Sequence, residues 1–270
     1  MDEERRIPRV LSIAGSDSGG GAGIQADLKA FARCGVHGMT AITAITAQNT
    51  VGVDAVDPVA PRTIVAQVRS VAGDIGVDAV KIGMLGSRET IEAVVKALDL
   101  LPQGTPVVVD PVMVAESGAD LLDLEARDAL VERILPRATV ATPNISVAAR
   151  LAGVPADSDP EELARAVHAL GPAYVVVTGG HRPEATDVFF DGSSITAIPG
   201  ERHPGGAAHG SGCTHSSALA AHLALGFEPL AAARRAKEIA AAAVRDGLDE
   251  VGAGAGPVDA LGVRARSSVA

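Results

Sequence analysis

The segment with the clearest chemical potential runs from His209 to Ser217 and reads His-Gly-Ser-Gly-Cys-Thr-His-Ser-Ser. Gly210 and Gly212 allow a tight turn whose backbone amides can approach a ligand closely. An apolar helix is predicted to follow over 216–225, and the unpaired N–H groups and dipole of a helix start favour an anion. The turn therefore suits phosphate, or the charge that develops in phosphoryl transfer. A Gly-rich turn that only begins a helix, with Ser and Thr as caps, is the alternative.

Cys213 lies where the helix dipole acts most strongly, so we expect its thiol to ionise more readily than a free thiol. It is a candidate base or nucleophile, and a thiol that merely lines a pocket is the alternative. Cys34, the other cysteine, is predicted to be a small buried apolar residue near the end of an amphipathic helix. Two cysteines so far apart match neither a disulfide framework nor a zinc site.

Composition narrows the class of protein. The 270 residues are 47% apolar with no Trp, one Tyr and four Phe, so small aliphatic side chains must build the core. The formal net charge of −10 argues against nucleic acid or an anionic membrane surface as the main partner. The sequence shows no secretory signal and no apolar window of membrane-spanning length, which predicts a cytoplasmic protein.

The elements that must position this chemistry alternate along the chain. Predicted strands cover 10–14, 39–47, 79–82, 106–110, 139–142 and 174–177, and a hairpin covers 186–198. Predicted helices cover 24–32, 61–75, 88–101, 124–135, 161–170, 216–225 and 229–245. This alternation of apolar strands with helices predicts one α/β domain, with a mostly parallel sheet covered on both faces and the hairpin at one edge. The tail from Gly252 is predicted to be loosely ordered, with at most a short strand near 261–263.

Several distinctive residues fall at the carboxyl ends of predicted strands, where parallel sheets bind ligands. They are Gln48, Met84, Asp110 and Asn144, and we expect them to converge. The amide of Gln48 offers both a donor and an acceptor to the edge of a heterocycle. The loop 15–23 contains five glycines but has neither the Walker spacing nor a clean dinucleotide fingerprint. We expect it to pack against a small planar ligand, and a merely flexible loop is the alternative.

Short blocks occur in a family-specific order along the chain: Ala14–Asp17, Gly20–Lys29, Thr46–Thr50, Lys81–Leu85, Asp110–Val114, Thr142–Asn144, Gly179–His181 and Gly210–Thr214. In this order the chain resembles the hydroxymethylpyrimidine/phosphomethylpyrimidine kinases, the thiamine-pathway branch of the ribokinase-like fold. The resemblance spans about residues 10–248. The first block and the Ala-Gln-Asn-Thr stretch are specific to the family rather than to the fold.

The resemblance implies a three-layer α/β/α homodimer that uses ATP and Mg²⁺ to phosphorylate 4-amino-5-hydroxymethyl-2-methylpyrimidine and then its monophosphate. The implied substrate residues are Gly15, Ala22, Asp27, Gln48, Met84 and Val112, with Gln48 holding the pyrimidine edge. The implied nucleotide residues are Asn144, Thr178, Gly180, His181, Thr214 and Lys237, although Lys237 could instead lie on a solvated helix face. Asp110 would hold magnesium, and Cys213 with Gly210, Ser211 and Gly212 would form the catalytic turn, where sugar kinases of this fold carry an aspartate base.

Two positions depart from the family pattern. Family members usually carry an acidic residue three positions after Asn144, which helps to hold magnesium, and this chain has Val147. The usual Val-Lys-Gly-Gly-His block has Thr178 in place of its lysine. These changes could mean slower chemistry, a single phosphorylation, a changed substrate or binding without turnover. A pyridoxal-type kinase of the same fold and a non-catalytic pyrimidine sensor therefore stay open as alternatives.

The histidines do not indicate a metal centre. The spacing of His181, His203, His209 and His215 matches no zinc pattern. His203 and His209 are predicted to be loop residues, one of which could approach a phosphate.

Overall fold

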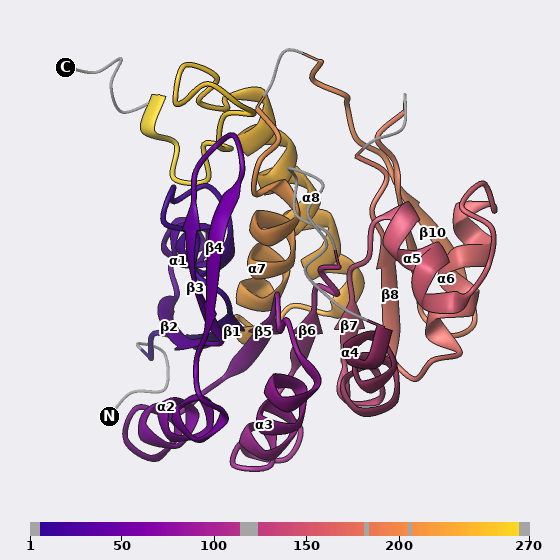
Figure 1. Cartoon of the computed structure of the whole chain (residues 1–270). Coiled ribbons are helices and arrows are strands. Elements are labelled where there is room, and N and C mark those ends of the chain that lie inside the picture. The colour runs from indigo at the N-terminus through magenta and orange to yellow at the C-terminus, as the bar shows by residue number, and fades with distance from the viewer. Residues whose placement is uncertain (1–5, 114–123, 181–183, 205–206, 265–270) are drawn as a thin grey trace.

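The computed structural model describes residues 6–113, 124–180, 184–204 and 207–264. Within these residues an eight-stranded sheet has the strand order β10-β9-β8-β7-β6-β5-β1-β2 (Figure 1). Strands β2, β1, β5, β6, β7 and β8 run parallel, and β9 and β10 form an antiparallel hairpin at one edge. The predicted α/β class, the mostly parallel sheet and the edge hairpin are confirmed.

The bounds of the elements follow the order of the chain. The strands are β1 Arg9–Ala14, β2 His37–Ile42, β3 Ala44–Gln48, β4 Val53–Pro58, β5 Ala79–Ile82, β6 Val107–Val109, β7 Val140–Ala141, β8 Tyr174–Val177, β9 Asp187–Phe190 and β10 Ile195–Ile198. The α-helices are α1 Gly23–Arg33, α2 Pro61–Asp74, α3 Arg88–Leu98, α4 Leu124–Ala129, α5 Ile145–Ala152, α6 Pro160–His168, α7 Ser211–Ala224 and α8 Pro229–Arg245.

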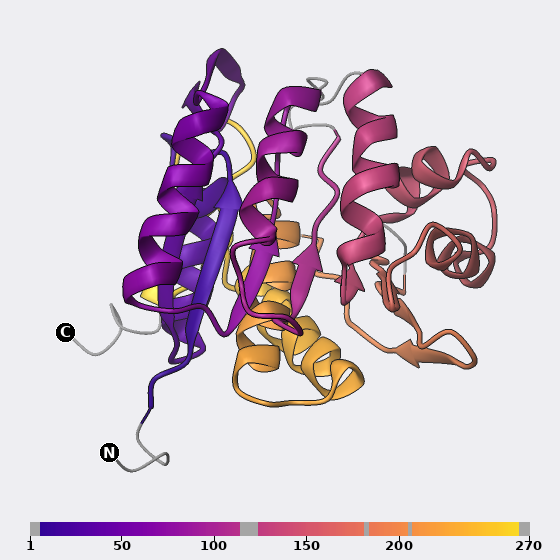
Figure 2. The same cartoon turned by 90° about the horizontal axis from the view of Figure 1, so that it is seen from below.

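The central strands are apolar throughout because both faces of the sheet are covered. Successive strand residues point to opposite faces, so Leu11 packs in one core and Val10 in the other. Helices α2, α3 and α4 cover the first face, and α1, α7 and α8 cover the second (Figure 2). The result is the predicted three-layer arrangement. None of the helices in the described part of the chain is long and apolar enough to cross a membrane.

The prediction of one strand over 39–47 is wrong. Strand β2 ends at Ile42, and β3 leaves the main sheet to pair antiparallel with β4 in a separate two-stranded sheet. Thr43 lies at the branch point, where its backbone N–H donates to Ala14 O and its hydroxyl donates to Met84 O. These buried contacts turn the chain, and β3 carries Gln48 over the main sheet.

The helical predictions hold with three corrections. Helix α5 was not predicted, although Asn144 caps its start and Gly153 ends it in the left-handed region. Helix α7 begins at Ser211 instead of 216, so Cys213 lies in its first turn. The segment predicted as one helix over 124–135 changes from α-helix to a π-helical turn over 130–134.

The tail is more ordered than predicted up to residue 264. Pro257 pairs with His209 in a parallel bridge, and Val258 N donates to His209 O at 3.0 Å. Val258 and Ala260 are buried against the end of α8. The expected short strand near 261–263 does not form: Leu261 lies in a turn, and Val263 and Arg264 are helical. The tail therefore braces the segment that enters α7.

Candidate active site

A cavity of about 500 Å³ opens at the carboxyl ends of the parallel strands. Its wall joins the loop after β1, Gln48 at the end of β3, Asp110 after β6, Thr178 after β8 and the first turn of α7. These segments are far apart in the sequence, and the parallel sheet brings their ends to one edge. The predicted convergence of strand ends is confirmed.

Most of the residues predicted for the site line this cavity. They are Gly15, Ala22, Gln48, Met84, Asp110, Val112, Asn144, Thr178, Gly180, Gly210, Ser211, Gly212, Cys213 and Lys237. His181 lies outside the described residues, as does Val114 of the block that begins at Asp110. Gln48 and Cys213 thus line one cavity, although they are 165 positions apart in the sequence.

Two predicted site residues do not line the cavity. Asp27 is fully buried beneath it, where it accepts hydrogen bonds from Ser12 and Ser217 at 2.6 and 2.7 Å. Thr214 is also fully buried, and its hydroxyl has no hydrogen-bond partner. Neither side chain reaches the cavity, because the helical register of α7 turns Thr214 inward and α1 does the same for Asp27. Their roles in substrate and nucleotide binding stay predictions.

Lys81 is a site residue that the sequence analysis missed. It is fully buried on β5, lines the cavity, and pairs with Asp27 at 2.8 and 3.0 Å. Burial opposes its charged form, but the nearby acidic groups, first Asp27 and then Cys213 and Asp110, together outweigh this effect and raise the pKa of Lys81. The signal was present in the sequence, since a lysine inside an apolar buried strand needs a partner or a function. Asp27 thus acts on the site by holding this ammonium group.

The turn before α7 has the geometry that the glycines predicted. Gly210 is the N-cap at φ 84°, in the left-handed region that favours glycine. A Cβ on Gly210 would lie 1.8 Å from Gly21 O, so the turn packs directly against the glycine-rich loop. Ser211, Gly212 and Cys213 follow in the first helical turn. Ser211 N donates to Ala208 O at 3.0 Å, whereas the amides of Gly212 and Cys213 have no intrahelical acceptor. These amides can bind a phosphate or a developing oxyanion.

The expected low pKa of Cys213 is wrong. Burial raises the pKa of its thiol to about 12, and the charge of Lys81 only partly opposes this effect. The carboxylates of Asp27 and Asp110 raise it further. The helix start therefore does not make Cys213 a ready thiolate, because loss of water and two nearby carboxylates outweigh the dipole.

Asp110 is the carboxylate at the centre of the cavity wall. Ser216 donates to Asp110 Oδ2 at 3.2 Å. Burial raises the pKa of Asp110, and the positive charge of Lys81 only partly opposes this shift. Among the residues that the structure describes, no group of three or more His, Cys, Asp and Glu side chains could hold a metal ion. A metal bound here by described residues would therefore have fewer than three such side chains as ligands and would take the others from water and phosphate oxygens.

Lys237, Asp187 and His215 form a second cluster of ionisable side chains in the cavity wall. Lys237 is buried and donates to Asp187 Oδ1 at 2.6 Å, so it does not lie on a solvated helix face. His215 Nε2 lies 3.5 Å from Asp187 Oδ2, and burial lowers the pKa of this histidine although Asp187 opposes the shift. Gly179 N also donates to Asp187, which ties this cluster to the end of β8. Through this cluster Lys237 supplies a positive charge next to Thr178, the position where family members usually carry a lysine.

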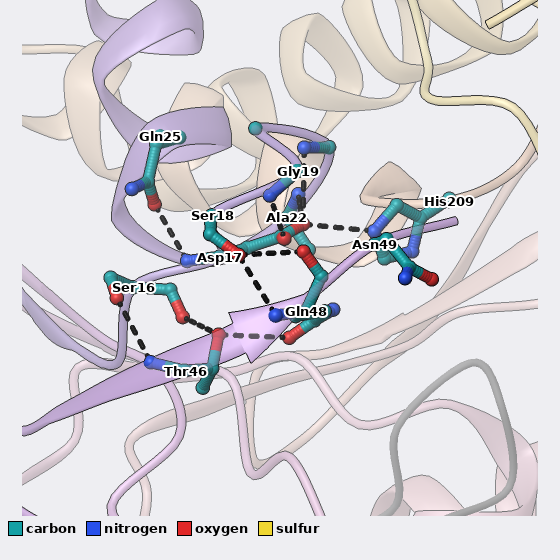
Figure 3. A network of polar contacts seen from close by, with 12 residues as sticks. Ser16, Asp17, Ser18, Gly19, Ala22, Gln25, Thr46, Gln48, Asn49 and His209 are labelled. Carbon is teal, nitrogen blue, oxygen red and sulfur yellow. Dashed lines mark hydrogen bonds and ion pairs between the residues drawn. The ribbon is translucent and has the colours of Figure 1, made fainter. Parts of the chain in front are cut away.

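The glycine-rich loop and Gln48 form the remaining wall (Figure 3). Ser18 Oγ and the backbone of Gln48 exchange two hydrogen bonds, at 2.6 and 2.8 Å. Thr46 Oγ1 donates to Ser16 O at 2.8 Å. Met84 packs against Gly15, where a Cβ would lie 2.4 Å from the methyl carbon of the methionine. This end of the cavity offers an amide side chain and a flat apolar floor.

Comparisons with known proteins agree with this geometry. The family model described as phosphomethylpyrimidine kinase matches residues 17–259. The chain belongs to the phosphomethylpyrimidine kinase family. A hydroxymethylpyrimidine/phosphomethylpyrimidine kinase of Rhizobium meliloti is 50% identical over 256 residues, which are 92% of this chain and 95% of that relative.

Two solved structures extend the comparison within and beyond the phosphomethylpyrimidine kinase family. The phosphomethylpyrimidine kinase of Clostridium difficile superposes with a TM-score of 0.75 at 40% identity, covering 86% of this chain and 96% of that one. A Bacillus subtilis pyridoxal kinase in complex with ADP superposes with a TM-score of 0.85 at 39% identity, covering 96% and 100%. The ribokinase-like fold is therefore shared with kinases named for two different heteroaromatic substrates.

Proposed function

We propose that this protein uses ATP to phosphorylate 4-amino-5-hydroxymethyl-2-methylpyrimidine and then its monophosphate, as its relatives' names indicate for thiamine biosynthesis. The observation that carries the proposal is one cavity lined both by the amide of Gln48 and by the turn at the start of α7. The pyrimidine lies at the Gln48 end, and the nucleotide lies toward Thr178, Gly180 and Lys237. The ADP complex of the similar pyridoxal kinase supports nucleotide binding to this fold.

In the proposed reaction, the hydroxymethyl oxygen forms a bond to the γ-phosphorus of ATP and the bond to the β,γ-bridging oxygen breaks, which releases ADP. The amides of the Gly210–Cys213 turn stabilise the charge on the transferring oxygens. Lys81, held by Asp27, adds a fixed positive charge to the cavity wall. The thiolate form of Cys213 accepts the proton of the alcohol as the oxygen–phosphorus bond forms, or the thiol lines the pocket while water accepts the proton.

Magnesium fits this donor set. Asp110 supplies a carboxylate on the cavity wall, and Mg²⁺ commonly keeps several waters and binds through one or two carboxylates plus substrate phosphates. When bound, the ion neutralises charge on the nucleotide phosphates. Asn144 Oδ1 caps α5 by accepting from Val147 N at 2.9 Å. Val147, which stands where family members carry the acidic residue, is therefore buried and part of this helix cap.

One assay separates the candidate functions. Purified protein is mixed with Mg-ATP and either the pyrimidine alcohol, its monophosphate or pyridoxal, and ADP release is followed. We expect turnover with both pyrimidines. The likeness to pyridoxal kinases favours pyridoxal phosphorylation as a second candidate, and turnover of pyridoxal alone would establish it in place of the first. Binding of the pyrimidine without ADP release would instead support a non-catalytic sensor.

Gln48→Ala tests the assigned contact with the pyrimidine edge. We expect the Kd for the pyrimidine to rise about two- to tenfold, because a hydrogen bond contributes roughly 0.5–1.5 kcal/mol net. Calorimetric titration measures the change. Asn49→Ala is a matched control, since Asn49 Oδ1 only accepts from Val51 N and Gly52 N in the exposed β3–β4 loop. An unchanged affinity in Gln48→Ala would contradict the contact.

Cys213→Ser tests the thiol as the proton acceptor. We expect kcat to fall about tenfold with pyrimidine affinity retained, because positioning and electrostatics carry most of phosphoryl transfer. Since the thiol pKa is about 12, the thiolate fraction rises with pH throughout the range 7–9. The wild-type kcat should then rise with pH in this range, and Cys213→Ser should lose that rise. Cys34→Ser is the control, and an unchanged rate and pH profile in Cys213→Ser would leave the thiol as a lining group.

The remaining expectations stay predictions. They are the homodimer, the cytoplasmic location and the organisation of all 270 residues as one domain. Size measurement of the purified protein in solution tests the first.

A further inference from the structure

Asp17 is the centre of a polar network beside the cavity, and the mechanism above does not use it (Figure 3). It is buried, and its carboxylate accepts from the backbone N–H groups of Gly19, Gly21 and Ala22 at 2.8, 3.0 and 2.8 Å. Its Oδ2 also lies 3.0 Å from His209 Nε2. Burial disfavours the carboxylate, but the hydrogen bonds from His209 and these amides outweigh it and lower the pKa of Asp17.

His209 belongs to the other side of the active site. It immediately precedes Gly210, the N-cap of α7, and it is buried. Its ring packs on Gly21, where a Cβ would lie 2.2 Å from His209 Cδ2. Its backbone oxygen accepts from Val258 N in the tail. The side chain thus points to the glycine-rich loop while the backbone is fixed from behind.

The glycine-rich loop is in turn fixed to the substrate end of the cavity. Ser18 exchanges hydrogen bonds with the backbone of Gln48, and Asp17 N donates to Gln25 Oε1 at 2.8 Å. A continuous chain of short contacts therefore leads from Gln48 through Asp17 to His209 and the phosphate turn. Of the contacts in this chain, the one from Asp17 to His209 spans the gap between the two loops.

We propose that His209 is a positioning residue for phosphoryl transfer. Its hydrogen bond to Asp17 sets the distance between the loop that holds the pyrimidine and the turn that holds the transferring phosphate. This inference rests on the proposed function. Reacting atoms must come within about 3–3.5 Å, and a misplacement of about 1 Å can lower the rate about a hundredfold. A bond between the two supporting loops acts on that distance.

The sequence analysis left open that His203 or His209 approaches a phosphate, and the geometry bears on this alternative for His209. His209 Nε2 is already engaged by the carboxylate of Asp17, and a carboxylate next to the ring disfavours a phosphate there. Although His209 also lines the cavity, the inference places its effect on the rate in its contact with Asp17.

The test compares His209→Ala, His209→Gln and the matched control His222→Ala in the same ADP-release assay. The amide nitrogen of Gln reaches nearly as far as Nε2 and can still donate to Asp17. His222 is a buried histidine of α7 that bonds Ala218 O at 2.7 Å and does not line the cavity. We expect His209→Ala to lower kcat about ten- to a hundredfold, with the pyrimidine Kd changed less than about threefold. His209→Gln should recover most of kcat, and His222→Ala should keep it.

A second measurement keeps the inference testable if His209→Ala folds poorly. His209→Leu keeps most of the ring's volume but cannot donate to Asp17. Combined with Asp17→Asn it gives a double-mutant cycle, and we expect the combined loss of kcat to be smaller than the product of the single losses. Full activity in His209→Ala, equal losses in His209→Ala and His209→Gln, or independent losses in the cycle would each overturn the positioning role. Absence of wild-type turnover would overturn the proposed function together with it, so the two failures are distinguishable.

Discussion

Gly210→Ala should lower kcat about 10²–10³-fold, the loss expected when a donor to a developing oxyanion is removed. At φ 84° an alanine is strained, and its Cβ would lie 1.8 Å from the backbone oxygen of Gly21. Since neither backbone segment can yield without moving the other, the turn must shift away from the glycine-rich loop. The amides at the start of α7 then no longer point to the transferring phosphate. Steady-state ADP release measures the loss.

Gly212→Ala is the matched comparison for this prediction. The same methyl group at Gly212 would lie 3.7 Å from Asp110 Oδ2, which is ordinary contact, and its φ is not in the left-handed region. We expect a much smaller loss of kcat than in Gly210→Ala, with circular dichroism confirming that both variants fold. Equal kcat values for the two variants would mean that the turn does not stabilise the reacting phosphate.

Lys81→Met should lower the free energy of unfolding by about 3–5 kcal/mol, because it leaves a buried carboxylate without its cation. Asp27 is fully buried, and its other partners are the hydroxyls of Ser12 and Ser217. Since the pKa of Lys81 is raised, the pair stabilises the fold at neutral pH and loses this effect only as pH rises past the lysine's ordinary pKa. Urea denaturation at pH 7 measures the difference.

The double variant Asp27→Asn with Lys81→Met identifies the cause. Removing both charges avoids the uncompensated carboxylate, so most of the lost stability should return. Both variants should lose activity, since Lys81 lines the cavity. A double variant as unstable as Lys81→Met would show that packing around the lysine stem, and not the ion pair, is responsible.

The sequence predicted the architecture well where one element carries its own pattern. The apolar strand at 10–14 and the helix at 229–245 match β1 and α8 closely, because burial and helical periodicity are local properties. The segment 39–47 failed because its β-branched run has the same pattern in both of its strands. Only the buried contacts of Thr43 and the pairing with β4 divide it, and both depend on segments distant in the chain.

The active site shows the same contrast between what local patterns predict and what contacts between distant segments decide. Asp110 could be placed at the site because strand ends converge in a parallel sheet, whereas Gln48 and Cys213 were placed there by the family resemblance. The roles of Lys81 and His209 could not, since each is defined by a carboxylate from another loop or helix. The pKa of Cys213 was predicted in the wrong direction for a related reason. The helix dipole is visible in the sequence, whereas dehydration and the two neighbouring carboxylates are not.

The bracing of His209 by Pro257 and Val258 has a practical consequence for handling the protein. Residues 256–260 are part of the scaffold behind the catalytic turn, although they contribute no side chain to the cavity. Shortening the polypeptide before this stretch, or attaching a fusion partner within it, would perturb the reaction centre. Expression variants should leave residues 256–260 intact, and surface immobilisation should avoid this end of the molecule.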